Sequence, residues 1–163
     1  SFMQAIGVGL AGATLVGRYK GAGDLAAAER TLGSALRLGL AVAILVATLF
    51  VAAPELLLSI YTTDAEVLAL GRPLLVLGAA FQLFDAIGII VSGALRGAGD
   101  TRWPFLVQTS LAWLVRLPFA WLFGIHLAGG VLGAWMAEFV FIIVLSGALW
   151  WRFRGGAWRG MAI

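Results

Sequence analysis

The sequence predicts an all-α polytopic membrane protein, because of its composition, its long apolar runs and the placement of its charges. Of the 163 residues, 62% are hydrophobic and only 12% are charged. A soluble domain of this size could not bury that much apolar surface in one core. The apolar runs are long enough for membrane-crossing helices, which need about 20 mainly apolar residues. We therefore expect a helical bundle surrounded by lipid.

Five apolar runs divide the chain, and we treat residues 1–163 as one transmembrane helical bundle. The predicted spans cover residues 2–16, 32–53, 73–95, 104–124 and 130–151. The first run is glycine-rich and, at about 15 residues, too short to cross a bilayer comfortably. We expect its start to lie before Ser1, so that the bundle is incomplete at its N-terminus and forms five helices of a six-helix lobe.

Basic residues alternate from one connection to the next. They surround the first and third connections and follow the last span, at Arg18, Lys20, Arg30, Arg96, Arg102, Arg152, Arg154 and Arg159. Under the positive-inside rule these segments are cytoplasmic, and the connections at 54–66 and 125–129 face outward. Four tryptophans fall at the predicted cytoplasmic ends, where indole rings favour the headgroup level: Trp103, Trp150, Trp151 and Trp158. We expect a multi-pass protein of the inner or plasma membrane with a cytoplasmic C-terminus.

The composition also argues against several other classes of function. Cysteine is absent and His126 is the one histidine, which removes thiol chemistry and most zinc sites. No Ser–Lys, His–Glu or paired-Asp arrangement falls at a plausible depth, so we expect no enzyme. The basic residues occur singly rather than as a patch, and we expect no nucleic-acid partner.

One four-residue string occurs twice, as Gly21-Ala22-Gly23-Asp24 and Gly97-Ala98-Gly99-Asp100. Each copy follows one apolar run and precedes the next. Glycine can take the left-handed conformation that ends a helix, and aspartate can cap the next helix. The string also fits the Gly-x-Gly-Asp pattern of intramembrane aspartyl proteases. Because both copies lie beside arginines at the membrane surface, we favour helical hairpins over a catalytic pair.

Small residues recur four apart in two of the predicted spans. The series are Ala5/Gly9/Ala13 and Gly129/Gly133/Ala137. Such spacing lets helix backbones approach closely within a membrane. It predicts bundle packing, not a site.

Several ionisable residues interrupt the apolar runs. Arg37 lies near the cytoplasmic end of its span and can extend its charge to the surface. Arg116 and Glu138 both lie ~12 Å from the outer ends of adjacent spans, which favours an ion pair. Asp85 lies ~18 Å into its span, near the middle of the hydrocarbon layer. An unpaired charge at such depth costs about 2.5–3.5 kcal/mol or more, so these groups must pair, become neutral or face water.

The third span carries one polar stripe that includes Gln82, Asp85 and Ser92. We expect it to face the polar side of the fourth span, formed by Gln108, Thr109, Ala112 and Arg116. Two interpretations remain open. Asp85, Arg116 and Glu138 could form a structural charge network, or they could mark an ion path. We favour the network for Arg116 and Glu138, and the ion path for Asp85.

Two stretches carry a family resemblance: Phe81-Gln82-Leu83-Phe84-Asp85 and Ser92-Gly93-Ala94-Leu95-Arg96-Gly97-Ala98-Gly99-Asp100-Thr101-Arg102. They resemble the tenth helix and following loop of multidrug and toxic compound extrusion (MATE) transporters. The surrounding order agrees, since Arg116-Leu117-Pro118 and Arg152-Phe153-Arg154 also match. The resemblance implies helices eight to twelve of a twelve-helix protein, with the seventh helix and the N-terminal lobe as missing partners.

The resemblance also implies a function. In the sodium-coupled branch an acidic residue of the tenth helix helps to bind the coupling cation, and Asp85 occupies the matching place. The implied activity is H⁺- or Na⁺-coupled antiport of drugs or lipophilic organic cations across membrane lipid. No cofactor is expected beyond the coupling ion, and no metal beyond Na⁺ at Asp85. The alternative is a flippase for a lipid-linked oligosaccharide, which the same superfamily contains and which would need a basic cavity.

Overall fold

A computed structural model describes residues 2–161, and within them the chain is helical with no strand. The bounds are α1 Met3–Gly21, α2 Leu25–Ala52, α3 Pro54–Ser59, α4 Ala65–Gly97, α5 Arg102–Leu111, a π-helical turn Ala112–Arg116, α6 Leu117–Trp121, a second π-helical turn Leu122–His126, α7 Gly130–Arg154 and a final 3₁₀ turn Ala157–Gly160. The predicted all-α class is confirmed.

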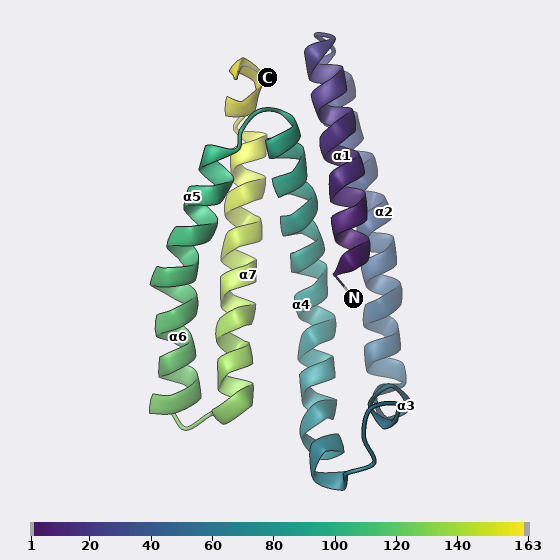
Figure 1. Ribbon diagram of the computed structural model, residues 1–163, viewed down its shortest axis with the longest axis vertical. Helices are drawn as coiled ribbons and strands as arrows, with labels where there is room; N and C mark the ends of the chain where they lie inside the picture. Colours follow the sequence, from purple (N-terminus) through teal and green to yellow (C-terminus); the bar gives the residue numbers. More distant parts are fainter. Residues whose placement is uncertain (1, 162–163) are drawn as a thin grey trace.

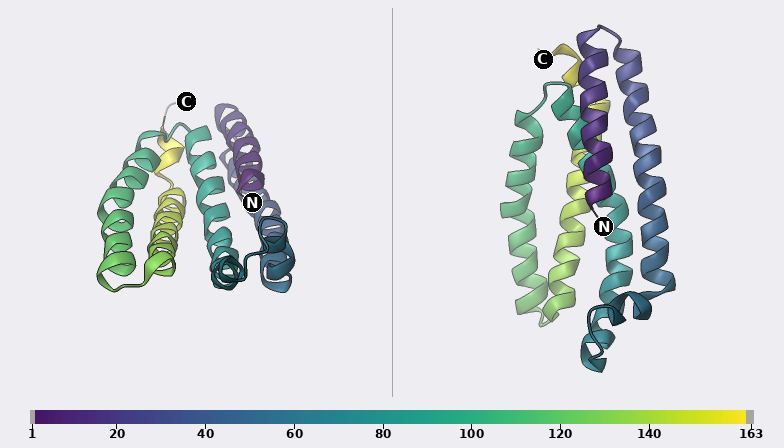
Figure 2. Two further views of the ribbon diagram at one scale, coloured as in Figure 1. Left: turned by 60° about the horizontal axis from the view of Figure 1, so that its bottom comes forward. Right: turned by 45° about the vertical axis from the view of Figure 1, so that its right-hand side comes forward.

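Four continuous helical stretches of the described residues are long and apolar enough to cross a membrane. They are Leu25–Ala52, Ala65–Gly97, Arg102–His126 and Gly130–Arg154. The helix α1 is not among them, and Figures 1 and 2 show it beginning partway along α2 and α4. The fifth span therefore stays a prediction.

The long helices extend beyond the predicted apolar runs, because capping residues rather than hydropathy set where they begin. Asp24 caps α2 by accepting a hydrogen bond from Ala27 N at 2.8 Å, so α2 begins at Leu25 and not at residue 32. Asp64 accepts from Glu66 N at 2.9 Å and caps α4 in the same way.

The third span is predicted to start at Pro73, and the structure places Pro73 inside α4, which begins at Ala65. A proline in a helix interior removes one backbone donor, which neighbouring residues in membrane helices often tolerate. The short helix α3, in the connection between α2 and α4, was not predicted. Its first residue is Pro54, whose fixed φ suits the start of a helix.

The core forms where α4 is packed against α1, α2 and α7. Its fully buried members on α4 include Ile90, Val91 and Leu95, and Trp158 of the C-terminal turn joins the same cluster. The helices α4 and α7 run in the same direction (Figure 1), and two aromatic pairs join them at successive levels. Phe81 meets Trp135 edge-on at 6.1 Å, and Phe84 meets Phe139 at 5.9 Å.

The stretch Arg102–His126 is packed along α7, to which the short loop after His126 joins it. The expectation that its polar side faces the stripe of α4 is therefore wrong, because this stretch is packed mainly against α7 and barely touches α4. Gln108 and Thr109 are exposed in the described structure. The two π-helical turns flank Pro118, and such turns often mark places where a helix adjusts its register.

The small-residue series make the close contacts that their spacing predicts. A Cβ added at Gly93 would lie 2.5 Å from Gly9 O, and one at Gly97 would lie 2.1 Å from Ala13 O. Where the turn Leu122–His126 meets α7, a Cβ at Gly133 would lie 2.2 Å from Phe123 O. The helices α1 and α4 thus touch backbone to backbone, as small residues allow in membrane bundles.

Candidate functional site

The polar stripe of α4 divides into two parts in the structure. Gln82 is buried and Asp85 is half-buried, and both line one small cavity. Ser92 is also buried but lies two turns further along α4 and does not line that cavity. The structure thus brings together two of the three stripe residues predicted from the sequence.

The cavity at Asp85 is closed by the beginning of α1 and the middle of α2. Its volume is about 10 Å³, and its lining is Phe2, Gln4, Ala5, Gly39, Val42, Ala43, Gln82, Asp85 and Ala86. That volume is about the least that holds one water molecule or a similar small species. Sequence reasoning missed Gln4. The available signal was its place as a polar residue in an apolar run.

A hydrogen bond from its amide nitrogen fixes the orientation of Gln82 and leaves its amide oxygen without a hydrogen-bond partner among the described residues. Its Nε2 donates to Ala43 O at 3.1 Å, while its Oε1 is buried without a hydrogen-bond partner among the described residues. A buried carbonyl oxygen without a donor carries a free-energy cost of about 1–3 kcal/mol. This oxygen is therefore an unsatisfied acceptor among residues 2–161.

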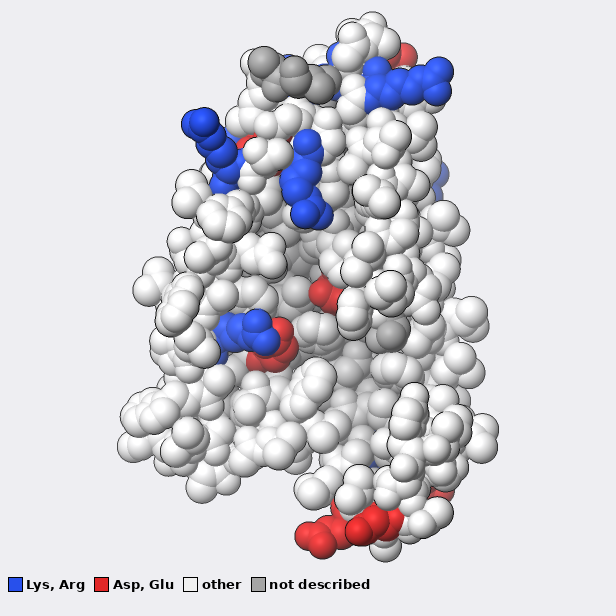
Figure 3. All heavy atoms as spheres, viewed as in Figure 1, with Lys and Arg blue, Asp and Glu red and all other residues white. Residues whose placement is uncertain are grey.

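Arg116 and Glu138 form an ion pair between the first π-helical turn and α7. Arg116 Nε lies 2.5 Å from Glu138 Oε2, and the two side chains are 50% and 24% exposed. The guanidinium also lies 5.7 Å from the centroid of the Phe141 ring. Figure 3 shows acidic and basic groups at mid-height on one face, apart from the basic residues gathered at one end and the acidic residues at the other.

Asp85 and Glu138 lie at the same level of the bundle. Each directly adjoins in sequence one member of the Phe84–Phe139 pair on the two parallel helices. Glu138 has Arg116 as its partner, whereas no ion pair of Asp85 occurs among residues 2–161. No cluster of three or more His, Cys, Asp or Glu that could hold a metal occurs in that part either. Asp85 is thus a carboxylate at mid-bundle depth without an ion-pair partner in the described part of the chain.

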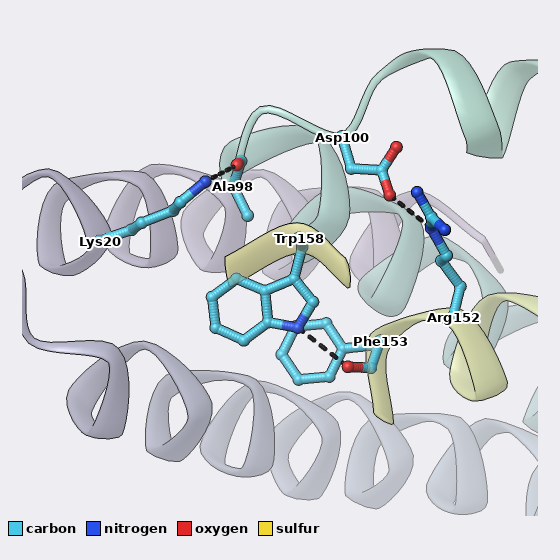
Figure 4. A network of polar contacts seen from close by, with 6 residues as sticks. All are labelled: Lys20, Ala98, Asp100, Arg152, Phe153 and Trp158. Carbon is cyan, nitrogen blue, oxygen red and sulfur yellow. Dashed lines mark hydrogen bonds and ion pairs between the residues drawn. The ribbon is translucent and has the colours of Figure 1, made fainter. Parts of the chain in front are cut away.

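A second polar network lies at the arginine-rich end of the bundle (Figure 4). Lys20 Nζ donates to Ala98 O at 2.5 Å and to Met161 O at 2.6 Å. Trp158 Nε1 donates to Phe153 O at 2.9 Å, and its ring is stacked on that of Phe153 at 4.9 Å. The two hydrogen bonds of Lys20 join segments far apart in the sequence, so no local pattern could have revealed them, whereas the contact between Trp158 and Phe153 is local.

The two identical loops differ in what their aspartates do. Gly23 and Gly99 both adopt positive φ, at 80° and 89°, as the hairpin interpretation requires. Asp24 caps the next helix, but Asp100 is 2% exposed and accepts a hydrogen bond from Arg152 Nε at 2.8 Å. The expectation that both are N-caps is therefore wrong for Asp100, because a charged partner from α7 competes for its carboxylate.

The comparison with known proteins now decides the family. The family model described as MatE matches residues 1–122. The chain belongs to the MatE family. It is 35% identical over 157 residues to a Rhodopseudomonas palustris protein named "Probable multidrug resistance protein NorM", covering 94% of this chain and 33% of the relative. A Thermotoga maritima protein of the same name is 34% identical over 164 residues, covering 100% and 35%.

A third relative, "Multidrug resistance protein NorM" of Burkholderia vietnamiensis, is 32% identical over 159 residues, covering 94% of this chain and 34% of the relative. The chain thus spans about a third of the length of the curated relatives it matches. Family membership and the apolar helices together make it a multi-pass membrane segment of a MatE protein.

Proposed function

We propose that this chain is the C-terminal lobe segment of a MatE multidrug efflux transporter driven by H⁺ or Na⁺, and that Asp85 takes up the coupling cation. The names of the relatives support drug export as the activity of the whole protein. The single observation that carries the role of Asp85 is its place in a cavity beside the unpartnered Gln82 Oε1. The lobe would act with a seventh helix and an N-terminal lobe, and its C-terminus would be cytoplasmic.

The physical basis is the cost of an isolated carboxylate in a low-dielectric bundle. Asp85 lies twelve residues before the end of α4, or ~18 Å from the arginine-rich end. A proton or Na⁺ that discharges it removes this cost reversibly. Carboxylate and amide oxygens are ligands that a hard cation prefers, so Asp85 and Gln82 Oε1 would provide two. A lipophilic cation would compete for the same carboxylate, which couples drug release to ion entry.

Replacing Asp85 by Asn in the full-length protein tests the proposal. We expect reconstituted vesicles with this variant to lose ethidium efflux driven by either a pH or a Na⁺ gradient. Asp64→Asn is the matched control, since it removes an exposed carboxylate while Asn still caps α4. Wild-type efflux by Asp85→Asn under both gradients would refute the coupling role. Melting temperature in detergent shows whether both variants are folded.

The flippase alternative keeps one specific observation in its favour, the half-exposed Arg116. A lipid pyrophosphate needs several cationic groups, yet the arginine here already has Glu138 as its partner. Drug export is therefore the better-supported function. Transfer of a fluorescent lipid-linked oligosaccharide across vesicles, unaffected by Asp85→Asn, would favour the flippase instead.

A further inference from the structure

A groove with a charged rim lies between α2 and α7 at the arginine-rich end of the bundle. Its volume is about 210 Å³, and its lining is Glu29, Leu32, Gly33, Leu36, Trp150, Phe153, Arg154 and Arg159. It is separate from the cavity at Asp85, with which it shares no residue. Nothing in the transport proposal uses it.

The floor and the rim of the groove differ in chemistry. Leu32 and Phe153 are buried members of the core cluster, and Leu36 is packed against it. Two arginines form the rim. Because the arginines lie at the end of the bundle while Leu36 lies further along α2 toward its middle, the groove is amphipathic along the helix axis.

The two rim arginines are held in place by tryptophans. The guanidinium of Arg154 lies 4.8 Å from the centroid of the Trp150 ring, and that of Arg159 lies 5.9 Å from the centroid of the Trp158 ring. Arg159 also pairs with Glu29, whereas no carboxylate pairs with Arg154 in residues 2–161. One net positive charge therefore remains over the groove.

We propose that this groove binds an anionic phospholipid, with the phosphate at Arg154 and one acyl chain along Leu32 and Leu36. Charge complementarity selects the occupant, since a fixed guanidinium favours a phosphate and basic pockets between membrane helices favour anionic headgroups. Space is available beside Gly33, where an added Cβ would meet no atom within 4 Å. A free phosphate would leave the apolar floor unused.

Native mass spectrometry of the full-length protein in detergent, titrated with phosphatidylglycerol, tests the proposal. We expect one tightly retained phosphatidylglycerol, and weaker retention of phosphatidylcholine with the same chains. Arg154→Gln should weaken phosphatidylglycerol binding about fivefold, since an arginine near an anionic lipid contributes ~1 kcal/mol. Arg37→Gln, which removes an exposed arginine of α2 outside the groove, should leave it unchanged.

A steric variant tests the location of the site without altering charge. Gly33→Leu would fill the groove and abolish the retained lipid. Gly147→Leu is its matched control, because Gly147 is an exposed helical glycine with equally open space and lies outside the groove. Equal binding of the two phospholipids, equal effects of Arg154→Gln and Arg37→Gln, or displacement of the lipid by millimolar inorganic phosphate would each overturn the proposal.

Discussion

The closest contact between α1 and α4 predicts that replacing Gly97 by alanine destabilises the folded protein. A Cβ at this position would lie 2.1 Å from Ala13 O and 2.7 Å from both Ala13 C and Ala13 Cα. Real Cβ atoms essentially never approach closer than 3.0 Å. All three atoms belong to backbone and cannot rotate away, so Gly97→Ala must push the two helices apart by about 0.9 Å or more at this level.

The expected magnitude follows from two opposing terms. Overpacking of this kind costs about 1–3 kcal/mol, and contact with three backbone atoms places Gly97→Ala toward the upper end. Replacing glycine by alanine in a helix returns about 1 kcal/mol. We therefore expect Gly97→Ala to destabilise the folded protein by about 1–2 kcal/mol.

Gly147→Ala provides the control, since its Cβ would meet nothing within 4 Å. It should be neutral or stabilising by up to about 1 kcal/mol. Thermal unfolding of the full-length protein in detergent, followed by tryptophan fluorescence, measures both variants. If Gly97→Ala melts at or above the temperature of Gly147→Ala, the backbone contact between α1 and α4 does not exist as described.

Three further predictions concern the two loop aspartates, the buried Trp158 and the cavity residue Gln82. Asp24→Asn should leave thermal stability nearly unchanged because asparagine caps equally well, whereas Asp100→Asn should lower it by about 1–2 kcal/mol through loss of the charged bond to Arg152; equal effects would contradict their different roles. Trp158→Ala should cost about 3–5 kcal/mol and Trp158→Phe much less, measured by the same unfolding assay. Gln82→Leu should raise the H⁺ or Na⁺ concentration for half-maximal ethidium efflux, and an unchanged value would remove Gln82 Oε1 from the ion site.

Hydropathy and charge placement predicted the four long membrane helices. In lipid each segment must satisfy its own backbone hydrogen bonds and be apolar along its length, and both properties can be recognised in the sequence of that segment alone. The same local reasoning predicted the close packing at Gly9 and Gly133. The loop pattern correctly predicted Asp24 as a helix cap, whereas hydropathy alone does not show that capping by Asp24 and Asp64 starts α2 and α4 before their apolar runs. Hydropathy does not detect such extensions into polar sequence.

The site was predictable only as far as a single helix determines it. The helical periodicity of the sequence placed Gln82 and Asp85 on one face of α4, but the walls of their cavity come from α1 and α2. The adjacency of α4 and α7 depends on the whole bundle and was not foreseen. Asp100 gives the clearest example. In the first copy of the repeated string Asp24 caps a helix, whereas in the second copy Asp100 binds Arg152, 52 residues away.

The two hydrogen bonds of Lys20 have a mechanical consequence for α4. One ammonium joins α1 to the turn after α4 and to the C-terminal segment, across sequence separations of 78 and 141 residues. The arginine-rich half of α4 is thus clamped, while its other half extends past the start of α1 and contains Pro73. Bending of α4 is then easiest at the boundary between the two halves. Asp85 and Gln82 lie at that boundary, since the beginning of α1 lines their cavity.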